Sequence, residues 1–316
     1  MPPLTLVRVV TAWRFDPLAL VLAVSVGASY AWAMRRVSGW PRTRSLPFYA
    51  VGLGGLLLVS VSFIGVYANT LFWVRAVQVI VLFMIVPFGL ALGAPATLAR
   101  KAFSEDVQQR LDRALASLPV RLATHPAAGS VLMLTTLWLL YFTGWYPAML
   151  RSGWLDVLTR LALLAIGFVY FYGRLQLDPA PRRYPHGIAL IISVVEGLVD
   201  AVLGLVLWLG PALVASAYYA GLHRGWGPSL RTDQIIGAGI LWIGGDLADL
   251  PFLGALLHRM NSRDTEEAAE IDRKLDETEK ALAISGHESV TPDEPVMLRP
   301  WWQDDPELSE RLRRDQ

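Results

Sequence analysis

Charged side chains interrupt several long apolar stretches of this sequence. The clearest, in chain order, are Arg75, Arg160, Glu196, Asp200, Asp233, Asp246 and Asp249, with the polar Gln234 beside Asp233. A charge at the centre of a bilayer costs at least about 2.5–3.5 kcal/mol on insertion scales, so such groups normally face a bundle interior and pair there. We therefore predict an intramembrane ion-pair network that includes Arg75, Arg160 and the acidic residues up to Asp246. The expected counter-ions of the two arginines are Glu196, Asp200 and Asp233.

Two roles are open for such a network. Glu196 and Asp200 are four residues apart and therefore share one helix face. A buried network that only holds helices together satisfies this pattern, and so does a path for protons or ions.

The residue types needed for other chemistry are missing from the apolar stretches. The chain has no cysteine, which removes disulfides, thiolate metal sites and cysteine nucleophiles. The five histidines lie at the ends of apolar stretches, in a connection or near the C-terminus: His125, His186, His223, His258 and His287. We find no nucleophile paired with a base and no metal triad, so we expect no enzymatic activity. The formal net charge of +1 gives no indication of a nucleic-acid partner.

The composition indicates a polytopic membrane protein. The chain has 316 residues, of which 54% are hydrophobic and 17% charged, whereas a soluble domain has about a quarter charged. A transmembrane helix needs about 20 mostly apolar residues. Seven stretches qualify, at residues 17–34, 47–67, 71–94, 127–147, 155–173, 186–209 and 234–257. We predict an all-α, seven-transmembrane-helix bundle whose first span is retained, because no cleavage site follows it.

The charges of the connections predict the orientation. Lysine and arginine are concentrated in residues 35–44, 100–121 and 174–183 and after the last span, and are sparse in the alternate connections. By the positive-inside rule the N-terminus lies outside and the C-terminus lies in the cytoplasm.

This orientation divides the chain into regions. Residues 1–16 form an extracytoplasmic segment and residues 17–257 the transmembrane domain, with a cytoplasmic amphipathic helix at about 104–118. This helix lies in the membrane interface or packs on its own bundle. Residues 258–284 form a charged cytoplasmic helix, and 285–316 a flexible tail. Trp301 and Trp302 of that tail serve as a partner-docking motif or an interfacial anchor.

Four motifs in order resemble one known family. They are "RFDPLALVLAVSVGASYAWAMRRV", "VIVLFMIVPFGLALGAPATL", "HPAAGSVLMLTTLWLLYFTGWYPAML" and "DQIIGAGILWIGG". Between about Phe15 and Leu257 the chain resembles the CtaG-type cytochrome c oxidase assembly factors, which are bacterial seven-span membrane proteins. The resemblance implies a multi-pass protein of the bacterial inner membrane, acting in the respiratory chain as an assembly factor or accessory subunit of an oxidase complex.

The chain departs from that family at the histidines. The family pattern has four, at positions occupied here by Arg75, Val79, Tyr141 and Arg160. Family members are thought to help supply copper, and a guanidinium stays protonated and cannot ligate a metal. We therefore expect no copper site and no other cofactor. Two alternatives are a copper-binding assembly factor that uses other ligands, such as methionines or His223, and an ion- or proton-conducting membrane protein.

Overall fold

The computed structural model describes residues 1–115, 117, 125–175 and 186–247, with residues 250, 254, 272–275 and 277 beyond them. The chain divides into two units, residues 1–260 and 261–316. In the second unit the described residues, 272–275 and 277, are helical. All regular structure in the described ranges is helical, which confirms the predicted all-α class.

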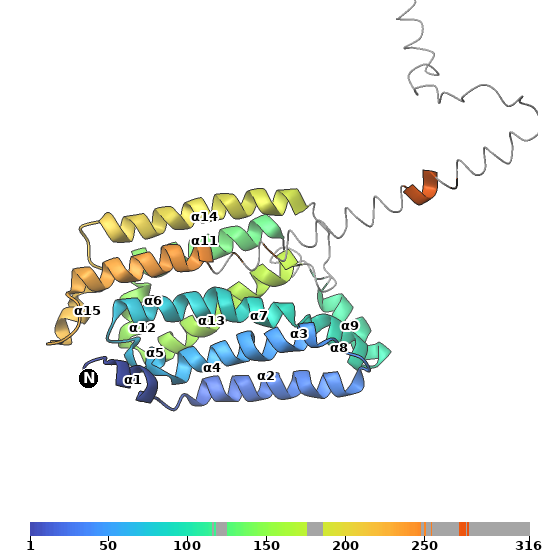
Figure 1. Cartoon of the computed structure of the whole chain (residues 1–316), viewed down its shortest axis with the longest axis horizontal. Coiled ribbons are helices and arrows are strands. Elements are labelled where there is room, and N and C mark those ends of the chain that lie inside the picture. Colours follow the sequence, from blue (N-terminus) through green and yellow to red (C-terminus); the bar gives the residue numbers. More distant parts are fainter. Residues whose placement is uncertain are drawn as a thin grey trace, which may run out of the picture. The chain divides into compact units, whose positions relative to one another are not determined.

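The helices of the first unit follow one another with short connections (Figure 1). In chain order they are α1 (Leu6–Thr11), α2 (Pro17–Arg36), α3 (Arg42–Pro47), η1 (Phe48–Leu53), α4 (Gly54–Val61), α5 (Phe63–Tyr67), α6 (Phe72–Ile80), η2 (Val81–Ile85), α7 (Val86–Leu92), α8 (Pro95–Ala102), α9 (Glu105–Leu115), α11 (Pro126–Phe142), α12 (Trp145–Arg151), α13 (Gly153–Leu175), α14 (His186–Leu209) and α15 (Ser216–Gly221). A last helix occupies residues 230–247.

Four of these helical runs are long and apolar enough to cross a membrane: Pro17–Arg36, Arg42–Val61, Phe72–Ala102 and Gly153–Leu175. A fifth is obtained if the pair Ala127–Phe142 and Trp145–Arg151, bent by 68°, counts as one span. The described residues thus confirm the prediction of helices that can cross a membrane, with four or five candidate spans. Helices α14 and 230–247 lie where the sixth and seventh spans are predicted.

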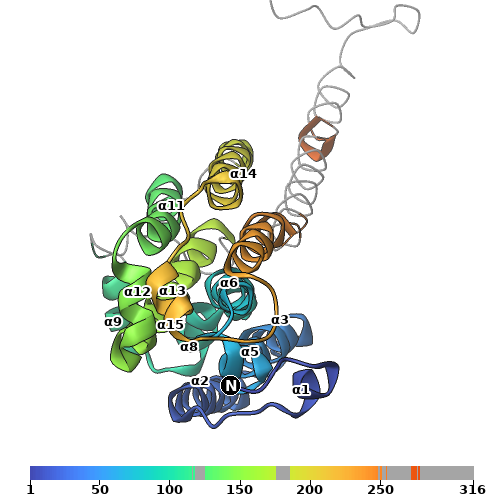
Figure 2. The same ribbon diagram turned by 90° about the vertical axis from the view of Figure 1, so that its left-hand side faces the viewer.

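The run Phe72–Ala102 is the centre of the first unit. In its most apolar window 72% of the residues are buried, against 28–39% in the other three runs. Val74, Ala76 and Phe83 are fully buried there. Helix α13 packs along η2 and α7, and α11 packs along α13. Other helices lie around this run in both views (Figures 1 and 2). Many of its buried side chains belong to the main apolar cluster of the first unit.

A proline shapes the middle of the central run. Pro87 has no N–H, so the carbonyl of Phe83, four residues earlier, cannot receive its α-helical hydrogen bond. The wider π turn of η2 precedes this proline. Gly167 of α13 lies against the same carbonyl, and a Cβ at that position would stand 2.1 Å from the Phe83 oxygen. Only glycine allows the two backbones to pack this closely.

The predicted cytoplasmic segments are described only in part. An amphipathic helix, α9, starts directly after Ser104 and corresponds to the predicted helix at 104–118. Most of residues 258–284, and the whole tail with Trp301 and Trp302, lie outside the described residues.

Candidate functional site

Arg75 is the most buried cation of the central run. Its side chain is 3% exposed, although it stands in the first turn of α6. One terminal nitrogen donates to Asp156 at 2.7 Å and to Gln78 at 2.8 Å, and the other donates to Asn69. Gln78 donates in turn to the carbonyl of Val59 at 2.9 Å. The guanidinium therefore links α6 to α13 and to the end of α5.

Asp156 also pairs with a second arginine. It lies in the first turn of α13, and its other carboxylate oxygen is 3.3 Å from Nε of Arg160, one helical turn later. Arg160 donates to Asp16 at 2.6 Å, and Arg14 donates to Asp16 at 2.9 Å. The five residues form a chain of ion pairs that joins α2, α6 and α13, which we call the Asp156 cluster: Arg14, Asp16, Arg75, Asp156 and Arg160.

Both carboxylates of the Asp156 cluster lie at helix N-termini, which carry a partial positive charge. Asp16 is the N-cap of α2 and accepts the backbone N–H of Ala19 at 3.1 Å. Burial raises the pKa of Asp16, but hydrogen bonds from Arg160, Ala19 and Arg14 outweigh this effect, and the pKa lies below its usual value. The cluster holds three arginines and two aspartates, so one positive charge is in excess.

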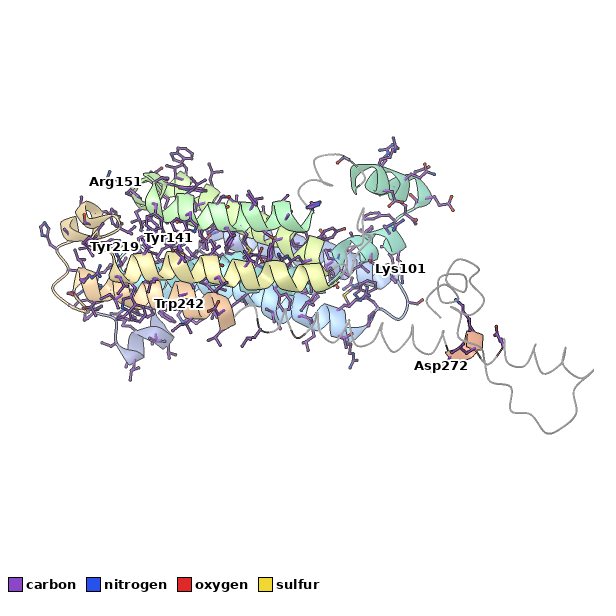
Figure 3. All side chains as sticks on the ribbon, turned by 90° about the horizontal axis from the view of Figure 1, so that it is seen from above. Lys101, Tyr141, Arg151, Tyr219, Trp242 and Asp272 are labelled. Atoms are coloured by element: carbon purple, nitrogen blue, oxygen red, sulfur yellow. The ribbon has the colours of Figure 1, made fainter. Side chains whose placement is uncertain are left out.

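A group of tyrosines lies near Arg75. Tyr146 and Tyr219 share a hydrogen bond of 2.8 Å, and the ring of Tyr141 lies 5.2 Å from that of Tyr146. Tyr141 and Tyr219 lie close together in Figure 3. The Tyr141 hydroxyl is buried and has no hydrogen-bond partner among the described residues, whereas Tyr218 donates to the carbonyl of Asn69 at 3.1 Å.

Asp233 and Gln234 hold helix ends in place. Helix α6 has no side-chain cap of its own, and Asp233 of helix 230–247 accepts the N–H of Trp73 at 3.0 Å instead. Its second oxygen is 3.3 Å from Arg224. Gln234 donates to the carbonyl of Leu207 at 2.9 Å and thereby fixes the end of α14. Asp233 thus connects helix 230–247 to α6, and Gln234 connects it to α14.

A second buried ion pair lies toward the other end of α13. Arg174 pairs with Glu196 of α14 at 2.9 Å, and the two side chains are 1% and 6% exposed. Arg174 also donates to Ser130 of α11, and Tyr170 donates to Glu196, both at 2.8 Å. This Arg174 cluster joins α11, α13 and α14.

The structure corrects the predicted counter-ions. Arg75 and Arg160 do lie in one ion-pair cluster, but their carboxylates are Asp156 and Asp16. The expected pairing of these arginines with Glu196, Asp200 or Asp233 is wrong: Glu196 pairs with Arg174, and Asp233 pairs with Arg224. Asp200 is half-buried on α14, Asp246 is exposed, and Asp249 lies outside the described residues.

Several charged partners that sequence reasoning missed lie near helix ends, among them Asp16, Asp156 and Arg174. In the sequence, Asp16 directly precedes the first predicted span and Asp156 lies at the start of the fifth. Arg174 belongs to the connection that follows the fifth span. Yet Asp156 and Arg160 are four residues apart with opposite charge, which is the spacing of a stabilising pair on a helix face. This spacing is the sequence signal that identifies Asp156.

The resemblance aligns Arg75, Val79, Tyr141 and Arg160 with family histidines, and among these side chains only the Tyr141 hydroxyl is a possible metal donor. Arg75 and Arg160 share Asp156, while Val79 and Tyr141 are buried in one apolar cluster. Guanidinium and valine side chains cannot ligate a metal, and the excess positive charge repels cations. In the described part of the chain, no group of three or more histidine, cysteine or acidic side chains is arranged to hold a metal.

The Asp156 cluster should behave as a coupled unit in stability measurements. Removal of one partner of a desolvated ion pair costs about 3–5 kcal/mol, because the other charge stays buried without compensation. We expect Arg75→Ala and Asp156→Ala each to lower the thermal unfolding temperature in detergent, and the double variant to lose less than the sum of the two. Arg151→Ala, which changes an exposed arginine at the same end, is the control and should have little effect. Strictly additive losses would contradict the coupling.

Comparison with known proteins identifies the family. The profile described as cytochrome c oxidase caa3 assembly factor (Caa3_CtaG) matches residues 28–263. Uncharacterized protein Mb0105 of Mycobacterium bovis and uncharacterized protein MT0111 of Mycobacterium tuberculosis are each 29% identical over 287 residues, and uncharacterized protein ML1998 of Mycobacterium leprae is 28% identical over 289. These alignments cover 87% of this chain and 43% of each relative, so the chain spans less than half the length of the curated relatives it matches. No solved structure matches. The chain belongs to the cytochrome c oxidase caa3 assembly factor family.

Proposed function

We propose that this chain is a non-enzymatic membrane protein that acts as an assembly factor or bound accessory subunit of a respiratory cytochrome c oxidase. The match of the family profile over residues 28–263 is the observation that carries this proposal. The described site supports a non-enzymatic role, because every charge of the Asp156 cluster pairs with another charge of the cluster. Helices of membrane length supply the surface through which such a protein contacts a membrane complex.

The proposed topology has seven spans in the bacterial inner membrane, with the N-terminus outside and the C-terminus in the cytoplasm. The arginine-rich residues 35–44 and the helices α8 and α9 lie at one end of the first unit, and α1, α12 and α15 lie at the other (Figure 1). The positive-inside rule assigns the arginine-rich end to the cytoplasm.

Reporter fusions test this topology. A reporter that is active only in the periplasm should be inactive when fused after Gln316, because the proposed C-terminus is cytoplasmic. The same reporter inserted after Gly225, in the connection at the opposite end, should be active and serves as the matched control. Activity after Gln316 would overturn the orientation.

Affinity purification tests the oxidase partner. The full chain, extracted from its own membranes in mild detergent, should retain oxidase subunits. Deletion of residues 286–316 should leave membrane insertion intact, because all seven proposed spans precede the cut. If Trp301 and Trp302 dock the partner, this deletion and the Trp301→Ala/Trp302→Ala variant should both weaken recovery of those subunits, as quantified by mass spectrometry.

The outcomes of that experiment separate the roles. If oxidase subunits are recovered equally with and without residues 286–316, the transmembrane domain contacts the oxidase. Purification of the chain without any oxidase subunit, under conditions that keep the oxidase itself intact, would contradict the proposal. A proteoliposome flux assay that showed proton or ion transport would favour the conducting alternative.

We further propose that the membrane domain binds no copper. Two observations support this. The side chains of Arg75, Val79 and Arg160 offer no atom that can ligate a metal, and the Asp156 cluster carries one excess positive charge, which repels cations. Metal analysis of protein purified after copper loading should give far less than one copper per chain. One tightly held copper, lost in a His223→Ala variant, would instead support an assembly factor that handles copper through other ligands.

A further inference from the structure

An apolar groove of about 850 Å³ lies beside α2, away from both ion-pair clusters. Ser25, Ser29 and Trp32 of α2 form one wall, residues of α7 and α8 continue the lining, and Phe168 reaches it from α13. The volume is within the range of about 300–1,000 Å³ that is usual for small-molecule sites.

The lining offers mainly hydrocarbon contact, and its hydroxyl groups already have partners. None of its residues is charged. The Ser25 hydroxyl donates to the carbonyl of Leu22, and the Ser29 hydroxyl donates to the carbonyl of Ser25. The Tyr30 hydroxyl donates to the Gly93 carbonyl at 2.8 Å and accepts from Trp40 at 3.0 Å. Because these hydroxyl groups already have partners, the part of a ligand that enters the groove is apolar.

The arginine-rich end of the groove is aromatic and cationic. The rings of Trp32 and Phe103, which both line the groove, lie 5.2 Å apart. The Arg36 guanidinium stands 4.1 Å from the centre of the Trp32 ring, and the Lys101 amine lies 6.0 Å from the ring of Trp40. Both cations are exposed, and neither has an acidic partner among the described residues. Aromatic rings with cations at a helix end are typical of the membrane interface, where the cations attract anionic headgroups.

The length of the groove distinguishes a lipid from a partner helix. From Ser25 to Arg36 the helix rises about 16 Å, close to half of the roughly 30 Å hydrocarbon core of a bilayer. The first two turns of α2, residues 17–24, do not line the groove. A transmembrane helix of a partner spans both leaflets and would need a longer groove, whereas one acyl chain spans a single leaflet.

We propose that this groove binds one anionic phospholipid, with an acyl chain along α2 and the phosphate beside Arg36 and Lys101. Figure 3 shows Lys101 at the end of the first unit opposite to Arg151 and Tyr219. The lipid site is therefore remote from the Asp156 cluster, and it is independent of the proposed oxidase role.

Native mass spectrometry of the full-length chain in detergent tests the site. The probes are phosphatidylglycerol, phosphatidylcholine with the same acyl chains, and glycerol 3-phosphate as a headgroup without a tail. We expect one phosphatidylglycerol to be retained per chain, with much weaker retention of phosphatidylcholine and none of glycerol 3-phosphate. A basic residue near the headgroup contributes about fivefold to affinity, so Arg36→Ala/Lys101→Ala should weaken phosphatidylglycerol binding by about thirtyfold.

Two further variants make the test specific. Arg8→Ala/Arg151→Ala removes two exposed arginines at the opposite end and should leave binding unchanged. Ser29→Trp, at an exposed position, fills the groove and should abolish retention of phosphatidylglycerol without lowering thermal stability. Equal retention of both lipids, or equal losses in the two double variants, would overturn the proposal. Retention in Ser29→Trp would overturn it as well, and binding of glycerol 3-phosphate alone would identify a soluble phosphate as the ligand.

Discussion

The sharing of Asp156 between Arg75 and Arg160 is the interaction on which the arrangement of the central helices depends. Arg75 is carried by the buried central run, and its charge would be prohibitively costly there without a carboxylate within hydrogen-bond distance. Because Asp156 also contacts Arg160, and Arg160 contacts Asp16, one chain of contacts sets the relative positions of α2, α6 and α13. The polar residues inside this membrane protein thus specify which helices are neighbours.

The three acidic residues at this end share a second property, since each lies at the start of a helix. Asp16 caps α2, Asp156 stands in the first turn of α13, and Asp233 caps α6 from another helix. The positive end of a helix dipole stabilises a carboxylate. Each aspartate therefore has the start of a helix on one side and an arginine on the other. This explains how several charges can be buried together at one end of the bundle.

Sequence reasoning found the helices more reliably than the contacts between them. Apolar length located both ends of α2 and α13 within two residues, because hydrophobicity directly reports burial in lipid. It located the start of the central run within one residue, but the run continues eight residues beyond the predicted end. It identified Arg75 and Arg160 as buried cations but assigned them to the wrong acids. Pairing depends on the depth of each side chain in the bundle, and Glu196 lies too deep: it pairs with Arg174, toward the other end of α13 from Asp156 and Arg160. The bend between α11 and α12 was also not predicted, since the apolar stretch at 127–147 continues through it.

The contact of Gly167 with the carbonyl of Phe83 bears on how this protein can move. Transporters that alternate between inward- and outward-open forms rock one group of helices against another. Here Gly167 of α13 packs against the π turn of the central run. If α13 slid along that run, Leu163 or Tyr170 would move toward the space that only a glycine can occupy. This contact therefore opposes sliding of one helix along the other. A protein built around such a contact is suited to presenting a constant surface to its surroundings.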